Sequence, residues 1–311
     1  MPPKVSIVTS TYNRSNVLAY AIESVRRGTF QDWEMIVVGD ACTDDSAEVV
    51  RAFGDPRIRF HNLPANHGEQ SKPNNIGIEM SQAEVVAFLN HDDLWFPDHL
   101  AVAVDALHTT GADLVNSHIL FLHQDGSLRP GFILGFAPNG RYAPHCYAPA
   151  SSWVLKRSLT ERIGGWRDRR SCWAIPSQDF LFRAHRSGAD LRTIPAVTVL
   201  GFSSVSRPGS YALRASDENR RALNAMTKDA GFRERLLLQF ALTTGEGQEA
   251  LPLAHPLRTF ARNLVCRLFR SCGIHRDAFR NAVLYRRRGK VIESYRRSRG
   301  LPAVPTSSST K

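Results

Sequence analysis

Residues 85–93 constrain the fold of this chain more than any other stretch. The apolar run Val-Val-Ala-Phe-Leu predicts a β-strand buried on both faces, as in a sheet covered by helices. Asn-His-Asp-Asp follows at once. Two adjacent carboxylates at the end of a hydrophobic strand repel each other, and a bound cation would offset that cost. A purely structural alternative is that Asp92 and Asp93 begin a turn and cap the helix that Pro97 opens.

Apolar runs alternate with helical patterns along the first 120 residues. Predicted strands cover residues 5–11, 34–38, 57–63, 85–89 and 112–120, and predicted helices follow residues 15, 46, 73 and 97. Such alternation is typical of an α/β fold with a mostly parallel sheet flanked by helices, in which ligands bind at the carboxyl ends of the strands. Because Arg14, Asp40 and the acidic cluster follow three of these strands, we expect a site at that edge.

The pattern loosens after residue 120. Residues 120–210 are rich in Pro, Gly and aromatic residues, and they predict a shaped surface over the sheet edge instead of a second core. Within this region a hairpin turn is expected at Asp125-Gly126 and a helix at 177–188. One further helical stretch is expected over residues 216–242.

The positive charge of the chain belongs to one segment. Residues 256–300 hold thirteen Lys or Arg against two acidic residues, a net charge of +11 that equals the charge of the whole chain. Residues 257–269 predict an amphipathic helix. A basic amphipathic helix followed by arginine clusters can lie on an anionic membrane, or its apolar face can pack on the protein's own core. Residues 301–311 predict a disordered tail.

The cysteine content and the N-terminus bear on the compartment. Five cysteines are an odd number without C-x-x-C spacing, which favours reduced thiols in the cytoplasm over a disulfide framework or a zinc ribbon. No apolar run approaches the roughly 18 residues of a membrane span, and the first residues lack a signal-peptide pattern. We therefore expect a cytoplasmic protein, with attachment to the inner face of the plasma membrane through residues 256–300 as an alternative.

Several segments taken together resemble the family 2 glycosyltransferases, which have the glycosyltransferase A-type fold. The matching segments are Ser6-Ile-Val-Thr-Ser-Thr-Tyr-Asn-Arg14, Ile36-Val-Val-Gly-Asp40, Asp44-Asp-Ser46, Asn66-His-Gly68, Asn74-Asn-Ile-Gly77, His91-Asp-Asp-Leu-Trp95, Ile163-Gly-Gly-Trp166 and Gln178-Asp-Phe180. The resemblance implies a catalytic domain at 1–245, with a nucleotide-sugar-binding half (1–120) and an acceptor-side half (121–245). Residues 246–300 then form a basic, amphipathic helical extension.

The resemblance implies a nucleoside diphosphate sugar as donor. Asp40 matches an aspartate that accepts a hydrogen bond from the nucleobase, commonly uracil, and a carboxylate can accept the ring N–H of uracil or thymine. A UDP- or dTDP-sugar is therefore favoured. Arg14 and Lys72 match basic residues near the nucleotide, although both could be solvated surface charges. The other donor-binding residues that the resemblance implies are Thr9, Tyr12 and Asp92.

His91, Asp92 and Asp93 match the D-x-D motif of the family, whose last aspartate binds a divalent cation. Asp93 is thus the implied ligand. On an extended backbone residues 91 and 93 point the same way and Asp92 the opposite way, toward donor hydroxyls. The family most often has Asp where this chain has His91. If a ring nitrogen of His91 binds the metal, it shifts the preference of the site from Mg²⁺ toward Mn²⁺. Otherwise His91 only forms hydrogen bonds.

Asp179 matches the aspartate that serves as general base in the family. Its neighbour is usually Glu, and Gln178 removes that like charge. A structural alternative is that Asp179 complements the dipole at a helix N-terminus. On the acceptor side we expect Gly165, Trp166 and Gln178. Gly165 would form a tight turn, and Trp166 would offer an aromatic face to a sugar ring. Core packing of Trp166 is an equal alternative.

The implied reaction is a single displacement that inverts the anomeric carbon, with a saccharide or lipid-linked hydroxyl as acceptor. Polysaccharide, glycolipid or other cell-surface glycan synthesis fits this chemistry. A sugar-phosphate nucleotidyltransferase is an alternative enzyme, but residues 9–14 lack the glycine-rich loop that grips a triphosphate. An inactive binding module is the alternative that His91 and Gln178 leave open. Nucleic acid is not favoured as a partner, because no recognised nucleic-acid-binding module accompanies the arginines.

Overall fold

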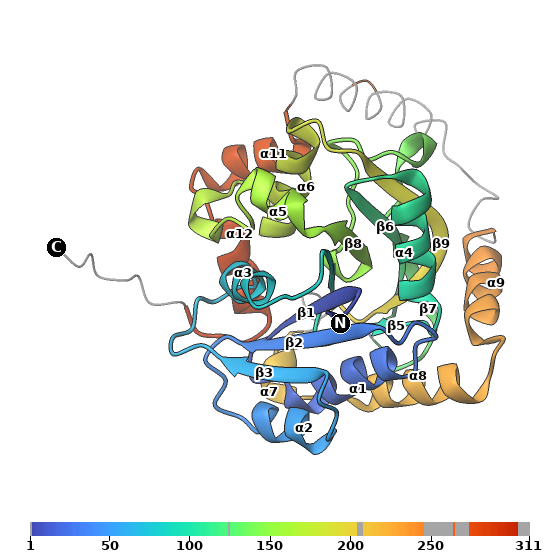
Figure 1. Cartoon of the computed structure of the whole chain (residues 1–311). Coiled ribbons are helices and arrows are strands. Elements are labelled where there is room, and N and C mark those ends of the chain that lie inside the picture. Colours follow the sequence, from blue (N-terminus) through green and yellow to red (C-terminus); the bar gives the residue numbers. More distant parts are fainter. Residues whose placement is uncertain (1, 124, 204–207, 246–263, 265–273, 304–311) are drawn as a thin grey trace.

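The computed structural model describes residues 2–123, 125–203, 208–245, 264 and 274–303 (Figure 1). Its described strands form one nine-stranded sheet. They are β1 (Val5–Thr11), β2 (Trp33–Gly39), β3 (Ile58–Asn62), β4 (Val85–Phe88), β5 (Leu94–Trp95), β6 (Leu114–Leu122), β7 (Pro130–Leu134), β8 (Trp153–Lys156) and β9 (Leu191–Gly201).

The sheet is mostly parallel at its centre. The strand order is β3-β2-β1-β4-β8-β6-β9-β5, and β7 pairs with β6. The first four strands in this order run parallel, and so do β6 and β9. Strand β8 runs antiparallel to both of its neighbours, as does β5 to β9 and β7 to β6. The predicted α/β fold with a mostly parallel sheet is therefore confirmed.

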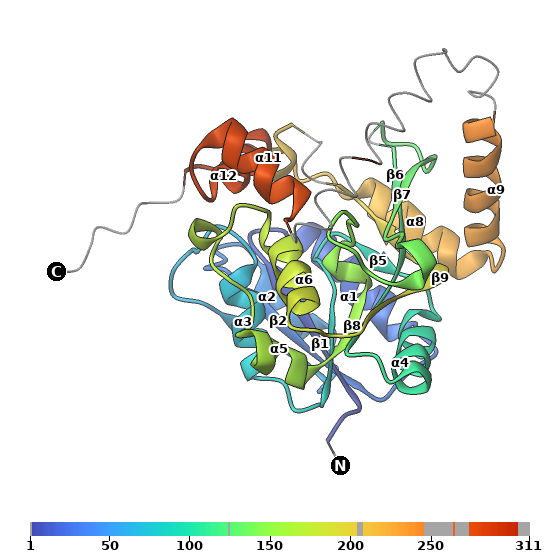
Figure 2. The same ribbon diagram turned by 90° about the horizontal axis from the view of Figure 1, so that it is seen from above.

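Helices cover both faces of the sheet (Figures 1 and 2). Helices α1 and α4 bury Leu18 and Leu107 in one core. Helices α5 and α6 bury Leu159 and Phe180 in a second core on the other face, together with Trp153 of β8. The described helices with eight or more residues are α1 (Ser15–Arg26), α3 (Ser71–Glu79), α4 (His99–Thr110), α6 (Pro176–Arg186), α8 (Asp217–Lys228), α9 (Phe232–Gly245), α11 (Arg276–Tyr285) and α12 (Lys290–Ser298); shorter ones are α2 (Ser46–Ala52), α5 (Arg157–Ile163) and α7 (Ser210–Leu213).

Three details of the predicted element order were wrong. Residues 120–210 do not only cover the sheet edge, because β8 inserts between β4 and β6 and its Trp153 is fully buried in the second core. The helical stretch at 216–242 is two helices, α8 and α9. Finally, the strand β5, which pairs with β9, was not predicted between the acidic cluster and the helix expected at Pro97, which is α4 and begins at His99.

The basic extension is described in part. Asn281 Nδ2 of α11 donates to Trp173 O at 3.0 Å, and Gly289 N, just before α12, donates to Cys172 O at 3.1 Å. Figure 2 shows α11 and α12 side by side beyond the N-terminal half of the sheet. The amphipathic helix predicted at 257–269 lies outside the described residues apart from Leu264, and so do residues 304–311 of the predicted tail. Among the described helices, none combines the length and the apolar character that crossing a bilayer requires.

Candidate active site

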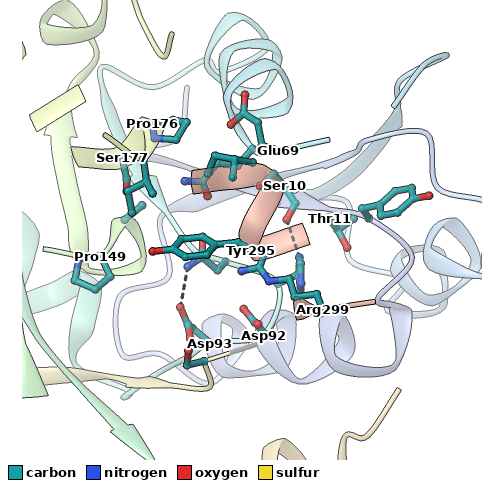
Figure 3. A pocket seen from close by; sticks show the side chains of 18 of the residues that line it. Ser10, Thr11, Glu69, Asp92, Asp93, Pro149, Pro176, Ser177, Tyr295 and Arg299 are labelled. Carbon is teal, nitrogen blue, oxygen red and sulfur yellow. Dashed lines mark hydrogen bonds between the residues drawn. The ribbon is translucent and has the colours of Figure 1, made fainter. Parts of the chain in front are cut away.

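A cavity of about 390 Å³ lies at the carboxyl ends of the parallel strands (Figure 3). The N-terminal half contributes the strand-end residues Ser10, Thr11, Tyr12, Asp40, His91, Asp92 and Asp93 to its wall. The wall also includes Glu69, Tyr147, Ser177 and Tyr211, and, from the C-terminal extension, Ile292, Tyr295, Arg296, Arg299 and Leu301. The predicted position of the site, at this edge of the sheet, therefore agrees with the cavity.

Asp93 is a buried carboxylate that three parts of the chain hold. Its Oδ1 accepts a hydrogen bond from Phe202 N at 3.0 Å. Its Oδ2 accepts from Asn90 Nδ2 at 3.0 Å and from the Ser151 hydroxyl. Burial, and then the charge of Asp92, raise the pKa of Asp93 above its ordinary value. The three donors show that Asp93 has a structural role whether or not a cation binds.

His91 and Asp92 lie in a turn and not on an extended backbone. Asp93 N donates to Asn90 O at 3.2 Å, which closes the turn. The prediction that the side chains of residues 91 and 93 point one way and that of Asp92 the opposite way assumed an extended backbone, and it therefore does not apply. Asp92 lines the cavity, and its backbone oxygen accepts from Asn219 Nδ2 at 2.8 Å.

The His91 ring lines the cavity and keeps one nitrogen without a hydrogen-bond partner among the described residues. Its Nδ1 lies 3.1 Å from Ser10 O, and because a carbonyl only accepts, Nδ1 carries the proton. Its Nε2 is buried without a hydrogen-bond partner among the described residues. Burial lowers the pKa of His91, which favours the neutral ring. A neutral imidazole with an open nitrogen is a suitable metal ligand.

The described residues contain no group of three or more His, Cys, Asp or Glu side chains arranged to hold a metal. Mg²⁺ and similar cations in phosphate sites often take only one or two protein ligands and complete their shell with phosphate oxygens and water. His91 Nε2 and the Asp92 carboxylate fit such a site. Asp93, the ligand that the family resemblance implies, is instead occupied largely by protein donors.

Asp40 is also largely occupied by its own chain. Its two carboxylate oxygens accept from His67 N at 2.9 and 3.0 Å and from Gly68 N at 2.8 Å, and His67 Nδ1 lies 3.0 Å from Oδ1. A carboxylate has about four acceptor positions, so these contacts leave little room for a nucleobase. Asp40 thus fixes the 66–68 loop at the cavity wall, while its predicted contact with the base remains a prediction.

Glu69 lines the cavity and was missed by the sequence analysis. Its Oε2 accepts from Ser71 N and from Ser71 Oγ, both at 2.8 Å. Its side chain is half-buried at the cavity wall, and this burial raises the pKa of Glu69 to about 7. The sequence carries no signal for this, because the burial depends on segments far along the chain.

Asp179 lies in the first turn of α6 but does not line the cavity, although its neighbours Pro176 and Ser177 do. Its Oδ2 accepts from Arg183 Nε at 2.7 Å. Arg183 also donates to the carbonyl oxygens of Ile163 and Gly165, each at 2.6 Å. The pair therefore fixes the turn that precedes Trp166.

The three residues expected on the acceptor side do not line the cavity either. Trp166 is 3% exposed and stacks on Trp153 at 5.6 Å between ring centroids, so core packing holds and its ring is not a platform for a sugar. Gln178 is buried and donates to Ala148 O at 3.0 Å. Gly165 has φ +66°, and a Cβ there would lie 2.7 Å from Asn75 Oδ1, which explains the glycine.

Among the other predicted donor-binding residues, Tyr12 lines the cavity and three do not. Arg14 is buried, donates to Ser210 O at 2.6 Å and lies 5.1 Å from the ring centroid of Tyr211, which does line the cavity. Thr9 is fully buried, and its hydroxyl has no partner among the described residues. Lys72 is exposed on α3.

The extension supplies the largest group of residues that the sequence analysis missed. A helical signal was present: Ile292, Tyr295, Arg296 and Arg299 follow i, i+3, i+4 and i+7 spacing, and all four line the cavity. Arg296 is 6% exposed and donates to Gly68 O at 2.9 Å. The alternative that the arginine clusters face a membrane is therefore wrong for Arg296, because its side chain points into the protein.

Residues 6–133 of the chain match the family model described as Glycosyl transferase family 2. An uncharacterized glycosyltransferase of Nostoc sp. is 35% identical over 51% of this chain and 53% of the relative. WcaA of Escherichia coli, whose provisional name is colanic acid biosynthesis glycosyl transferase, is 35% identical over 32% of this chain and 36% of WcaA. The chain thus spans about half the length, or less, of these relatives.

Solved structures share the fold. TarS of S. aureus, in complex with UDP-GlcNAc, has a TM-score of 0.55 and 15% identity, and the match covers 96% of this chain and 90% of TarS. The mannosyltransferase PcManGT from Pyrobaculum calidifontis, in complex with GDP-Man and Mn²⁺, has a TM-score of 0.54 and 19% identity over 91% of this chain and 87% of that protein. The predicted glycosyltransferase A-type fold is confirmed.

The raised pKa of Glu69 predicts a pH dependence of stability. Its carboxyl group stabilises the fold fully below the ordinary pKa of 4.5, and this contribution is lost as the pH rises through about 7. We expect Glu69→Gln, which still accepts from Ser71, to gain about 1 to 3 kcal/mol over wild type in free energy of unfolding between pH 5 and 8. Urea denaturation across this range measures the difference.

Glu79→Gln is the matched control, because Glu79 is exposed at the end of α3, the helix that begins two residues after Glu69. Its pH profile should follow wild type. A Glu69→Gln profile parallel to wild type would contradict the burial of an ionisable group at this position.

Proposed function

We propose that the chain transfers a sugar from a nucleoside diphosphate sugar to a hydroxyl acceptor, in the synthesis of a polysaccharide or another cell-surface glycan. The observation that carries the proposal is the convergence of Tyr12, Asp40, His91 and Asp92 on one cavity at the carboxyl edge of the sheet. All four lie in the part of the chain that matches the family. In this proposal residues 1–120 bind the donor and residues 121–245 the acceptor.

The names of related proteins support the choice of substrates. WcaA and TuaG carry provisional names in colanic acid and teichuronic acid biosynthesis, and both products are polysaccharides. The solved relatives hold UDP-GlcNAc or GDP-Man. A UDP- or dTDP-sugar is our proposed donor for this chain, because the family resemblance implies that Asp40 accepts the N–H of uracil or thymine. Asp40 would have to release one of its contacts with His67 or Gly68 to bind the base.

A divalent cation, Mn²⁺ or Mg²⁺, would neutralise the departing diphosphate as a Lewis acid. His91 Nε2 and Asp92 are the residues we propose to hold it, because both residues line the cavity and His91 Nε2 has no hydrogen-bond partner among the described residues. Asp93 supports them by fixing the turn. The nitrogen ligand favours Mn²⁺.

Asp179 is the proposed general base of an inverting displacement. The first turn of α6 borders the cavity through Pro176 and Ser177, so an acceptor bound there approaches Asp179. Arg183 holds the carboxylate at 2.7 Å, so the acceptor hydroxyl must reach the other oxygen or replace Arg183. If the protein transfers no sugar, the second candidate function, an inactive binding module, is favoured.

Donor binding is the first prediction of this proposal. We expect a UDP- or dTDP-sugar with Mn²⁺ to raise the melting temperature, because a ligand at 100 times its Kd stabilises by about 2.7 kcal/mol. Asp92→Asn should lose the part of the shift that requires Mn²⁺, whereas Asp105→Asn, on the exposed side of α4, should keep it. No shift with any UDP-, dTDP- or GDP-sugar in either cation would contradict donor binding.

Asp179 yields the second prediction. We expect Asp179→Asn to lower kcat at least 100-fold, as removal of a general base does, and to leave the affinity for the donor within about twofold of wild type. Asp190→Asn is the control, since Asp190 also pairs with arginines and does not line the cavity. Turnover of Asp179→Asn equal to wild type would remove Asp179 from the mechanism.

We also propose contact with an anionic membrane through α11. Phe279, Val283 and Leu284 lie on one side of this helix and are 49%, 59% and 65% exposed, and three consecutive arginines follow at 286–288. Exposed apolar side chains next to arginines are the pattern of interfacial helices. An acceptor carried on a lipid would then lie close to the enzyme.

Sedimentation with vesicles tests this contact. At low salt the protein should bind vesicles that contain phosphatidylserine more than vesicles of phosphatidylcholine alone. The double variant Val283→Ser, Leu284→Ser should bind several-fold less. The double variant Leu238→Ser, Leu242→Ser on α9, where both leucines are about equally exposed, should bind like wild type. Equal binding to both kinds of vesicle would contradict the proposal.

A further inference from the structure

We propose that the C-terminal helix α12 and the residues after it complete the donor site, and that Arg299 binds the diphosphate of the nucleotide sugar. This inference rests on the proposed function and adds a residue that the family match does not include, since the match ends at residue 133. Five residues between 292 and 301 nevertheless line the cavity.

Hydrogen bonds from two sides hold α12 against the catalytic domain. Gly289, which precedes the helix, donates from its N to Cys172 O at 3.1 Å, and Arg169 pairs with Glu293 at 3.5 Å. At the other end, Gly209 N donates to Ser298 O at 3.0 Å, and Tyr211 N donates to Arg299 O at 3.3 Å. The position of Arg299 is therefore defined by backbone contacts, not by its own side chain.

Arg296 joins the same helix to the opposite wall of the cavity. Its guanidinium donates to Gly68 O at 2.9 Å, and Gly68 N in turn donates to Asp40 at 2.8 Å. Arg296 also donates to Pro302 O at 2.9 Å. With both carbonyls as acceptors, Arg296 is a positioning residue that links α12 to the loop held by Asp40.

The Arg299 side chain has no such partners among the described residues. Its Nε is buried without a hydrogen bond, and the structure gives its guanidinium no carboxylate within ion-pair distance among the described residues. Figure 3 shows Arg299 and Tyr295 reaching into the cavity over Asp92 and Asp93. A partly buried guanidinium without acceptors is costly, so an anionic ligand would satisfy it.

The surrounding groups fit a diphosphate better than a simple carboxylate. Arg14, Arg296 and Arg299 all lie close enough to influence the ionisation of Tyr211, as does Asp92. Arginine binds phosphate oxygens through two parallel N–H donors, which a flexible lysine does not reproduce. A cation at His91 and Asp92 and the guanidinium of Arg299 would then contact the same diphosphate from two directions.

Binding of nucleotides to full-length variants tests the inference. Isothermal titration calorimetry with UDP, dTDP and GDP, each beside its nucleoside, separates the contribution of the phosphates. For the diphosphate that wild type binds, we expect Arg299→Ala to weaken binding at least tenfold and to leave binding of the nucleoside within twofold. Arg299→Lys should recover only part of the loss, because lysine keeps the charge but not the paired donors.

Arg297→Ala is the matched control, because it removes the same charge from an exposed position in the last turn of α12, two residues before Arg299. It should bind every ligand like wild type. If wild type binds one diphosphate and Arg299→Ala binds it equally well, or loses the nucleoside to the same extent, the inference is wrong while the proposed function stands. If wild type binds none of the three diphosphates, the proposed function itself fails.

Discussion

The carboxylate of Asp93 is the contact on which the arrangement of the site depends. Three residues donate a hydrogen bond to this carboxylate: Asn90 after β4, Ser151 before β8 and Phe202 after β9. A buried carboxylate without these donors would be costly, so the three segments must meet at this point. Their meeting brings the end of the central strand to the far side of the curled sheet and leaves His91 and Asp92 in a turn that faces the cavity.

The part of the fold that follows from local patterns could be predicted from the sequence. The apolar runs of β1, β2 and β4 and the polar residues after them identify the parallel sheet and the edge that carries the cavity. Tyr12, Asp40 and Asp92 accordingly line it. The sequence analysis failed where a partner lies far along the chain. The insertion of β8 depends on pairing with β4 and β6, and the burial of Trp166 depends on Trp153 and Phe180.

The roles of charged residues were the hardest to predict for the same reason. Asp179 has the spacing of an i, i+4 pair with Arg183, yet only the structure shows that Arg183 also holds the turn at Gly165. In the basic extension, Arg296 and Arg297 are adjacent and chemically identical, but one is buried against Gly68 and the other is exposed. The net charge of +11 counts both arginines equally and does not tell the buried one from the exposed one.

The contribution of residues 292–301 to the cavity wall has a consequence for biosynthesis of the protein. The strands that precede Tyr12, Asp40 and Asp92 leave the ribosome more than two hundred residues before Arg299 does. Domains fold as their segments emerge during synthesis, so a nascent chain can pair its first four strands long before the cavity has its final wall. A polypeptide interrupted before residue 292 would lack the part of the cavity wall that α12 and the residues after it form.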